Sequence, residues 1–305
     1  MKVHVLQENP EWYPPLAAAF DAEGVPHEPW LLGAGTLDLD APPPPGIFWS
    51  RMSASSHTRG HVHAKDHTRA VLSWLEAHGR RVVNGRRVLE LEMSKADQLT
   101  ALRAAGIEVP RTLAVVGPEA LLDTAGKFTA PFIVKHNQGG KGLGVRRFDA
   151  VAELAEYLGG PDYEPPVDGI TLVQEYLEAA APQITRVEIV GGEFVYALTA
   201  DTARGGFTLC PADACAVPGQ SLFALRRDFE HPLVGQYLDF AARHGIEVAG
   251  FEFIETVDGR AVTYDVNTNT NYNPEIEALA PRSGPRQIAR YLKRLLEHER
   301  AARGK

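Results

Sequence analysis

The chain has 305 residues, a net charge of −8 at pH 7, and 44% apolar and 23% charged residues, which is typical of globular proteins. Its length is about twice that of a common domain, so two or three lobes are expected. The acidic balance argues against a duplex nucleic-acid partner. Two cysteines, Cys210 and Cys215, are too few for a disulfide framework or a four-cysteine zinc site. The start shows no signal-peptide pattern, and no stretch reaches the ~20 apolar residues of a membrane span. We therefore expect a cytoplasmic protein without a membrane partner.

The first 92 residues show strands alternating with helices. Apolar residues predict strands at residues 3–6, 47–49 and 81–84, and a helix carries Val71 and Leu75. This alternation predicts an α/β domain with a largely parallel sheet over residues 1–92.

A helix and a small lobe are predicted next. Ser94 is a suitable N-cap, and Gly106 a suitable C-terminal glycine, for a helix between them. Strand-like runs at residues 112–116 and 132–136 flank a second, shorter helix. We expect a linker helix and a small lobe over residues 93–172.

The remaining residues, 173–305, are predicted to form a third lobe. A buried-strand pattern at residues 170–177 precedes two hairpins, which turn at Gly191-Gly192 and at Asp258-Gly259. The chain ends in an amphipathic helix, because apolar residues recur with helical spacing over residues 288–296.

The second hairpin brings two acidic side chains together. With a two-residue turn at Asp258-Gly259, Glu252 faces Asp265, and Asn267 points to the same side of the ribbon. Two facing carboxylates repel each other unless a cation lies between them, and Mg²⁺ prefers such oxygen ligands. Glu252, Asp265 and Asn267 are therefore candidate magnesium ligands, with a solvated acidic hairpin face as the alternative.

Residues 132–145 contain a glycine-rich loop between two predicted strands. Its glycines allow the backbone to approach a ligand closely, and backbone N–H groups in such loops bind phosphate oxygens. Because the loop leads into a strand, it is not a Walker A loop, and it also lacks the Rossmann spacing. A flexible hairpin tip is the alternative.

Two lysines also indicate an anionic ligand. Lys135 lies in an apolar strand just before the glycine loop, where an unpaired charge is unfavourable. Lys95 begins the predicted helix after Ser94, where the helix dipole disfavours a cation. A phosphate would explain both positions, whereas simple solvation is the alternative for Lys95.

Taken in order, these segments resemble the ATP-grasp superfamily over residues 90–280, nearest to its RimK-like amino-acid ligases. The resemblance rests on Ser94-Lys95, Lys135 with the glycine loop, residues 173–177, Thr185-Arg186, Glu252, and Asp265-Val266-Asn267. It implies an ATP-grasp fold in which residues 1–92 form the N-terminal pre-ATP-grasp domain and the nucleotide lies between two α+β lobes.

The resemblance also implies roles for single residues. Those that would contact the phosphates are Lys95, Lys135, Gly139, Gly140, Lys141 and Gly142. Those that would hold adenine and ribose are Gln174, Glu175, Tyr176, Leu177 and Glu178. The cofactors would be ATP and two Mg²⁺ ions, with Mn²⁺ as an alternative metal. The partners would be a carboxylate and an amine, each an amino acid or a peptide, and a homo-oligomer is compatible with the sequence.

In the family reaction, a carboxylate attacks the γ-phosphate of ATP, and an amine then attacks the acyl-phosphate. This chemistry depends on positioning and charge neutralisation, and Arg186 and Arg204 are the candidate catalytic cations for the phosphate or the tetrahedral oxyanion. A kinase of the same fold, or a non-catalytic nucleotide-binding module, is the alternative function.

Three departures from the family pattern are visible. The metal set runs Glu, then Asp-x-Asn, where the family usually has Asp, then Glu-x-Asn. Ile184 stands where the family often has an acid two residues before Arg186. Residues 268–273 replace a Ser-Pro-Gly-like turn, so the family's glutamate substrate does not carry over.

The segment from Arg51 to His67 is rich in basic residues and follows a predicted strand. Ligands bind at the carboxyl ends of strands in open α/β sheets. The candidates to bind the substrate carboxylate are therefore Arg51, His57 and Arg59, to which the resemblance adds Asn269 and Asn271. A solvated polar loop, or a zinc site built from the four histidines at positions 57, 61, 63 and 67, is the alternative.

Overall fold

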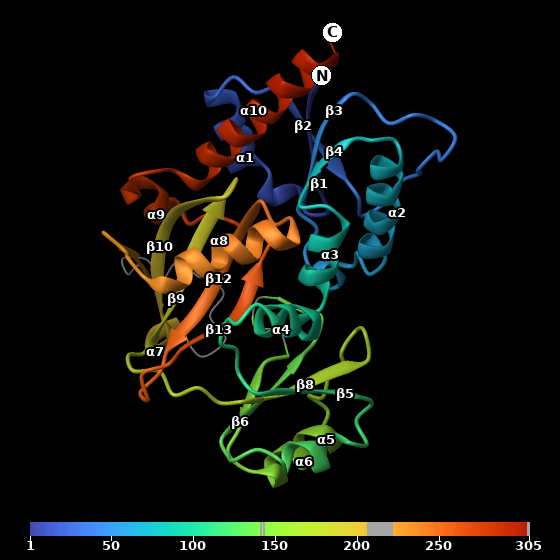
Figure 1. The fold of residues 1–305 in the computed structure, drawn as a ribbon. Coiled ribbons are helices and arrows are strands. Elements are labelled where there is room, and N and C mark those ends of the chain that lie inside the picture. The colour runs from blue at the N-terminus through green and yellow to red at the C-terminus, as the bar shows by residue number, and fades with distance from the viewer. Residues whose placement is uncertain (141, 143, 206–221, 304–305) are drawn as a thin grey trace.

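The described part of the chain contains three sheets, whose arrangement is shown in Figure 1. The computed structural model describes all residues except 141, 143, 206–221 and 304–305. Lys141 and both cysteines lie outside the described residues. No helix in the described part of the chain is both long and apolar enough to cross a membrane.

The first sheet is parallel, as the alternation of strands and helices predicts. Its strands, in spatial order, are β2 (His27–Leu31), β1 (Lys2–Gln7), β3 (Gly46–Ser50) and β4 (Arg81–Val83). One face packs on α2 (Ala64–Ala77) through a core that includes Leu6, Phe48 and Leu72. The 3₁₀ turns η1 (Pro10–Trp12) and η2 (Ser56–Arg59) follow β1 and β3.

The other face of this sheet packs on α1 (Pro14–Ala22) and on the last helix, α10 (Gly284–Arg303). Val5 and Trp49 share one apolar core with Phe20 and Leu292. Figure 1 accordingly shows the red C-terminal helix beside the blue N-terminal strands. The last helix of the chain therefore completes the core of the first domain.

The second sheet is antiparallel and covered on one side by α5 (Leu121–Ala125) and α6 (Val151–Gly159). Its strands, in spatial order, are β5 (Thr112–Val116), β8 (Ile170–Glu175), β6 (Phe132–His136) and β7 (Arg146–Phe148). The predicted lobe boundary at residue 172 falls inside β8, which pairs with β5 and β6 along its whole length. The division into three domains stays a prediction, and we propose to place this boundary after Glu175.

The third sheet is also antiparallel. Its strands, in spatial order, are β11 (Phe223–Arg226), β10 (Glu193–Asp201), β9 (Gln183–Val190), β12 (Val248–Glu255) and β13 (Ala261–Asn267). One face packs on α8 (Pro232–His244), α3 (Arg86–Met93) and α4 (Lys95–Ala104). The short helices α7 (Thr202–Gly205) and α9 (Pro274–Leu279) follow β10 and β13.

Several local predictions are confirmed. The hairpin between β9 and β10 turns at Gly191-Gly192, since Val190 pairs with Glu193. Ser94 caps α4, because its Oγ accepts a hydrogen bond from the Asp97 N–H at 3.2 Å. Gly106, just past the helix, has a φ of +80°, which favours glycine.

The hairpin between β12 and β13 corrects one prediction and confirms another. The turn is not two residues long, because the Thr256 N–H donates to the Arg260 carbonyl and leaves three residues between them. A bulge in β13 then shifts the register, so that Phe253 pairs with Thr263 but Glu252 pairs with Asp265. The predicted pairing of the two acids is therefore confirmed, although the turn that predicted it is wrong.

Candidate nucleotide and metal site

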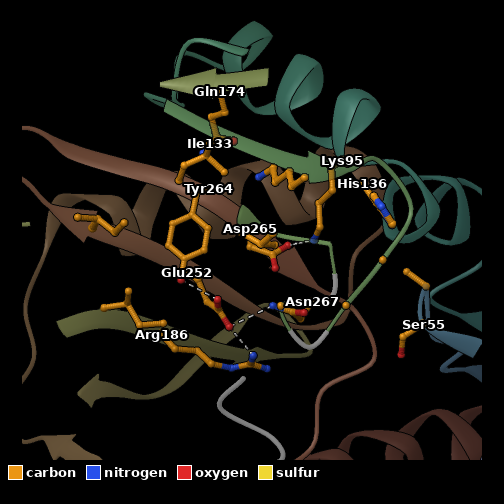
Figure 2. Close-up of a pocket in the computed structure, with 18 of the residues that line it drawn as sticks. Ser55, Lys95, Ile133, His136, Gln174, Arg186, Glu252, Tyr264, Asp265 and Asn267 are labelled. Atoms are coloured by element: carbon orange, nitrogen blue, oxygen red, sulfur yellow. Dashed lines mark hydrogen bonds and ion pairs between the residues drawn. The ribbon is translucent and has the colours of Figure 1, made fainter. Parts of the chain in front are cut away.

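A cavity lies between the second and third sheets, and residues 53–55 of the first domain also line it (Figure 2). The predicted site residues that line this cavity are Lys95, Lys135, Gly139, Gly140, Gly142, Gln174, Tyr176, Leu177, Arg186, Glu252, Asp265, Asn267, Asn269 and Asn271. Residues from six separate segments of the chain therefore meet at one place.

The facing acids lie on the floor of this cavity. Glu252 is 4% exposed, and its carboxylate accepts hydrogen bonds from Arg186 Nη1 at 2.8 Å and Tyr264 Oη at 2.9 Å. Asn267 Nδ2 donates to the same carboxylate at 3.2 Å, while Asp265 forms an ion pair with the Lys95 ammonium (Figure 2). Two carboxylates and an amide therefore converge on one side of the ribbon, which fits a Mg²⁺ ligand set.

The bulge in β13 adds a third side chain to this group. A bulge turns two successive residues of one strand toward the same partner residue. Tyr264 and Asp265 consequently both line the cavity beside Glu252. The Tyr264 hydroxyl reaches Glu252 for this reason, and the sequence pattern contained no sign of it.

Charge and burial act differently on the two acids. Burial raises the pKa of Glu252, although Arg186 opposes the change. Burial also acts to raise the pKa of Asp265, but the Lys95 ammonium outweighs it and holds that pKa below its usual range. Asp265 is thus the more strongly ionised of the pair, as a metal ligand must be.

Lys135 differs from Lys95 and Arg186 of the cavity wall in its lack of an acidic partner among the described residues. It is 8% exposed, and burial together with the nearby Lys95 lowers its pKa to about 8. No acidic side chain of the described residues forms an ion pair with it, whereas Lys95 pairs with Asp265. A bound anion is the partner that this arrangement lacks.

Arg186 is held from three sides. Its Nε donates to Glu188 at 2.5 Å, its Nη1 to Glu252, and its Nη2 to Thr270 Oγ1 at 2.7 Å. Gly250 leaves it room, since a Cβ there would lie 2.4 Å from Nη2. The acid that is missing at position 184 therefore has a counterpart in Glu188, two residues beyond Arg186 on the same strand.

Other predicted residues lie outside this cavity wall. Glu175 and Glu178 line a neighbouring depression with Arg111 and Phe128. The Glu175 carboxylate there accepts a hydrogen bond from the Arg111 N–H at 2.7 Å. Arg204 lies in α7, but its side chain is outside the described residues, as is Lys141.

The three basic residues that were predicted to bind the substrate carboxylate lie behind or beside the cavity. Arg51 is 2% exposed and donates to Gln7, to the Thr270 carbonyl and to Asn271 Oδ1, so it supports the wall from behind. Arg59 pairs with Glu8, and His57 Nδ1 lies 3.2 Å from the Ala54 carbonyl. Neither of these two lines the cavity.

The zinc alternative finds no support in the described residues. No three His, Cys, Asp or Glu side chains in that part of the chain come together in a way that could hold a metal. His61 pairs with Glu8, and His67 Nδ1 lies 3.2 Å from the Leu32 carbonyl. The proposed magnesium ligands are not such a cluster, because they are two carboxylates and the amide of Asn267.

Sequence reasoning missed several residues of the wall, including Ser53, Ser55 and Glu92. Glu92 accepts two hydrogen bonds from Thr268, from the backbone N–H at 2.7 Å and from Oγ1 at 2.8 Å. It therefore holds the segment that follows Asn267. Its position one helical turn after Val88, on the apolar face of α3, is a signal that could have revealed it.

Comparisons with known proteins bear on the fold of the chain. Residues 93–210 match the model of the RimK-like ATP-grasp domain. No curated protein is significantly similar to the chain in sequence.

Solved structures match the chain over nearly its whole length. A RimK domain ATP-grasp protein from Sphaerobacter thermophilus DSM 20745 has a TM-score of 0.68 and 19% identity, over 95% of this chain and 99% of that one. The D-cycloserine synthetase DcsG has a TM-score of 0.66 and 18% identity, over 96% and 99%. The ATP-grasp ligase PsnB, complexed with a minimal precursor, Mg and ADP, has a TM-score of 0.66 and 17% identity, over 96% of both chains.

The chain therefore has the ATP-grasp fold, as the sequence predicts. Within that class, the match over residues 93–210 is to the RimK-like ATP-grasp domain.

Proposed function

We propose that the chain is an ATP-dependent carboxylate–amine ligase of the cytoplasm. It joins the carboxylate of an amino acid or peptide to an amine through an acyl-phosphate, and it releases ADP and phosphate. The observation that carries this proposal is the meeting of Glu252, Asp265 and Asn267 with Lys95 and Lys135 in one cavity between two sheets.

Each group in the cavity then has a task. Lys135 and the backbone of Gly139 and Gly140 bind the phosphates, because all three line the cavity beside the acids and Lys135 forms no ion pair with the described residues. Gln174, Tyr176 and Leu177 hold the base at the other end of the cavity.

Mg²⁺ would be held by Glu252, Asp265 and Asn267, and it would neutralise the phosphates during transfer. We propose two ions, with Mn²⁺ as a substitute. Arg186 stabilises the charge that develops on the transferred phosphate, since Glu188, Glu252 and Thr270 fix its guanidinium.

The substrate end of the cavity is polar but carries few exposed charges. Ser53, Ser55, Asn269 and Asn271 line it, and the buried Arg51 lies behind Asn271. Such a polar wall suits an amino acid or a peptide as the substrate. The solved structures of this fold include a D-cycloserine synthetase and MdnC, a macrocyclase bound with its precursor peptide MdnA, and both substrate classes belong in the test.

The test is a screen of paired carboxylates and amines with ATP and Mg²⁺. ADP release is measured, and the product is identified by mass. A ligase releases ADP only when both partners are present and yields a mass equal to their sum less one water. ADP release without the amine, with a phosphorylated product, would show a kinase instead.

A further inference from the structure

Two consecutive amide side chains anchor the start of the glycine loop. Asn137 and Gln138 follow β6 and are 3% and 2% exposed. Asn137 Oδ1 accepts a hydrogen bond from the Ala96 N–H at 2.8 Å, and its carbonyl accepts one from the Lys95 N–H at 3.1 Å. Asn137 thus holds the loop against the first turn of α4, which carries Lys95.

Gln138 binds the first domain instead. Its Nε2 donates to the Ala54 carbonyl at 3.2 Å, and its Oε1 accepts from Lys65 Nζ at 2.6 Å. Both ends of this buried amide are therefore satisfied by residues more than 70 positions away in the chain.

Gly140, two residues after Gln138, lies against the same segment of the first domain. A Cβ on Gly140 would be 3.5 Å from the Ser55 Cβ. Gly139, Gly140, Ser53 and Ser55 all line the cavity. The loop that we assign to the phosphates therefore touches the wall that we assign to the substrate.

The hydrogen bond between Lys65 and Gln138 has a charged donor and is 2.6 Å long. Hydrogen bonds with a charged donor are shorter and roughly twice as strong as neutral ones. Lys65 lies in the first turn of α2, where a cation gains nothing from the helix dipole. Its contact with Gln138 consequently accounts for its orientation.

We propose that Gln138 is a positioning residue that ties the glycine loop to Ala54 and Lys65, and so closes the phosphate end and the substrate end into one compartment. This inference rests on the proposed ligase function. In the closed compartment, the amine attacks the acyl-phosphate and displaces phosphate. When the tie is broken, water attacks the same carbonyl, and the products are the original carboxylate and phosphate. ADP is then released without an amide.

The test compares Gln138→Ala, Lys65→Ala and the double variant. For the unaltered chain we expect one ADP per amide bond formed. Both single variants should release more ADP than amide, whereas a residue that only stabilises the fold would lower both products equally. Binding of a non-hydrolysable ATP analogue, measured by calorimetry, should weaken about fivefold to tenfold in each.

The double variant shows whether Lys65 and Gln138 act through one shared contact or independently of each other. Because Lys65 acts through Gln138, its loss should add nothing further to Gln138→Ala. The matched control is Arg69→Ala, one turn along α2, whose guanidinium pairs with Asp66 and Glu90 away from the cavity. It should keep one ADP per amide and unchanged binding of the analogue.

Three results would overturn the proposal: one ADP per amide in both single variants, effects on binding that multiply in the double variant, or the same loss in Arg69→Ala. If no pair of substrates is ligated at all, the proposed function fails, yet the calorimetric comparison still decides whether Lys65 and Gln138 act together. If Gln138→Ala does not fold, Lys65→Ala carries the test. Lys65 lies in the first turn of α2 and is only partly buried, so its replacement should leave the fold intact.

Discussion

The two sheets that enclose the cavity hold their charges in opposite ways. On the third sheet, Arg186 is bound to Glu188 and Glu252, and Asp265 is bound to Lys95. On the second sheet, Lys135 is also buried but forms no ion pair with any described residue, and its pKa is lowered to about 8. The charged groups of the third sheet are therefore paired within the described part of the protein, whereas Lys135 is left to be paired by a ligand.

The largest expected effect comes from removing an acid of the third sheet. Asp265→Ala should abolish ligase turnover, because it deletes a metal ligand and leaves Lys95 without its partner. Circular dichroism should show an unchanged fold. Asp258→Ala, at the exposed tip of the same hairpin, is the control and should retain full activity. Unchanged turnover in Asp265→Ala would remove the metal role of this residue.

Replacing Arg186 on the third sheet and Lys135 on the second sheet should change the free energy of unfolding by different amounts. Arg186→Met leaves two buried carboxylates unpaired and should lower the free energy of unfolding by about 3–5 kcal/mol. Lys135→Met removes a buried charge that forms no ion pair with the described residues, so it should leave the stability unchanged or raise it. Urea unfolding of both variants checks the comparison, and equal destabilisation would contradict it.

The same Lys135→Met variant should bind nucleotide poorly. Loss of a charged hydrogen bond to a phosphate weakens binding of an ATP analogue by about 10- to 100-fold. Calorimetry in Mg²⁺ buffer measures this. Lys127→Met, an exposed lysine of the same lobe, is the control and should bind as the unaltered chain does.

The smallest expected effect is on pH dependence. The pKa of Lys135 is about 8 in the folded chain and about 10.4 in an unfolded one. Between these values the unfolded state holds more of the proton, so this residue makes stability rise with pH over that window. ATP favours the protonated lysine, so binding of the analogue should weaken as pH rises above about 8. Neither trend should appear in Lys135→Met.

Sequence patterns predicted the features that depend on local spacing. The pairing of Glu252 with Asp265 follows from strand periodicity, and the cap at Ser94 follows from residue type. The same reasoning gave the wrong turn length, and the register survived because the bulge at Tyr264 compensated for it. The longer turn and the bulge offset each other, so neither could be recognised in the pattern of apolar and polar residues.

Contacts between distant segments could not be predicted. Gly250 becomes part of the Arg186 site only when β9 and β12 pair. The role of Gln138 depends on its hydrogen bonds with Lys65 and Ala54, which only the folded chain brings next to it. Arg51 has the residue type of a ligand contact, yet the fold places it behind the wall, because Thr270 and Asn271 lie between it and the cavity.

The position of α10 has a consequence for synthesis of the protein. Residues 1–92 leave the ribosome well before α10, but the core around Val5 and Trp49 includes Ile288 and Leu292. That apolar face stays partly exposed until α10 has been made. The first domain consequently cannot complete its core before α10 is available, and a nascent chain cut short before residue 284 would carry an open hydrophobic surface.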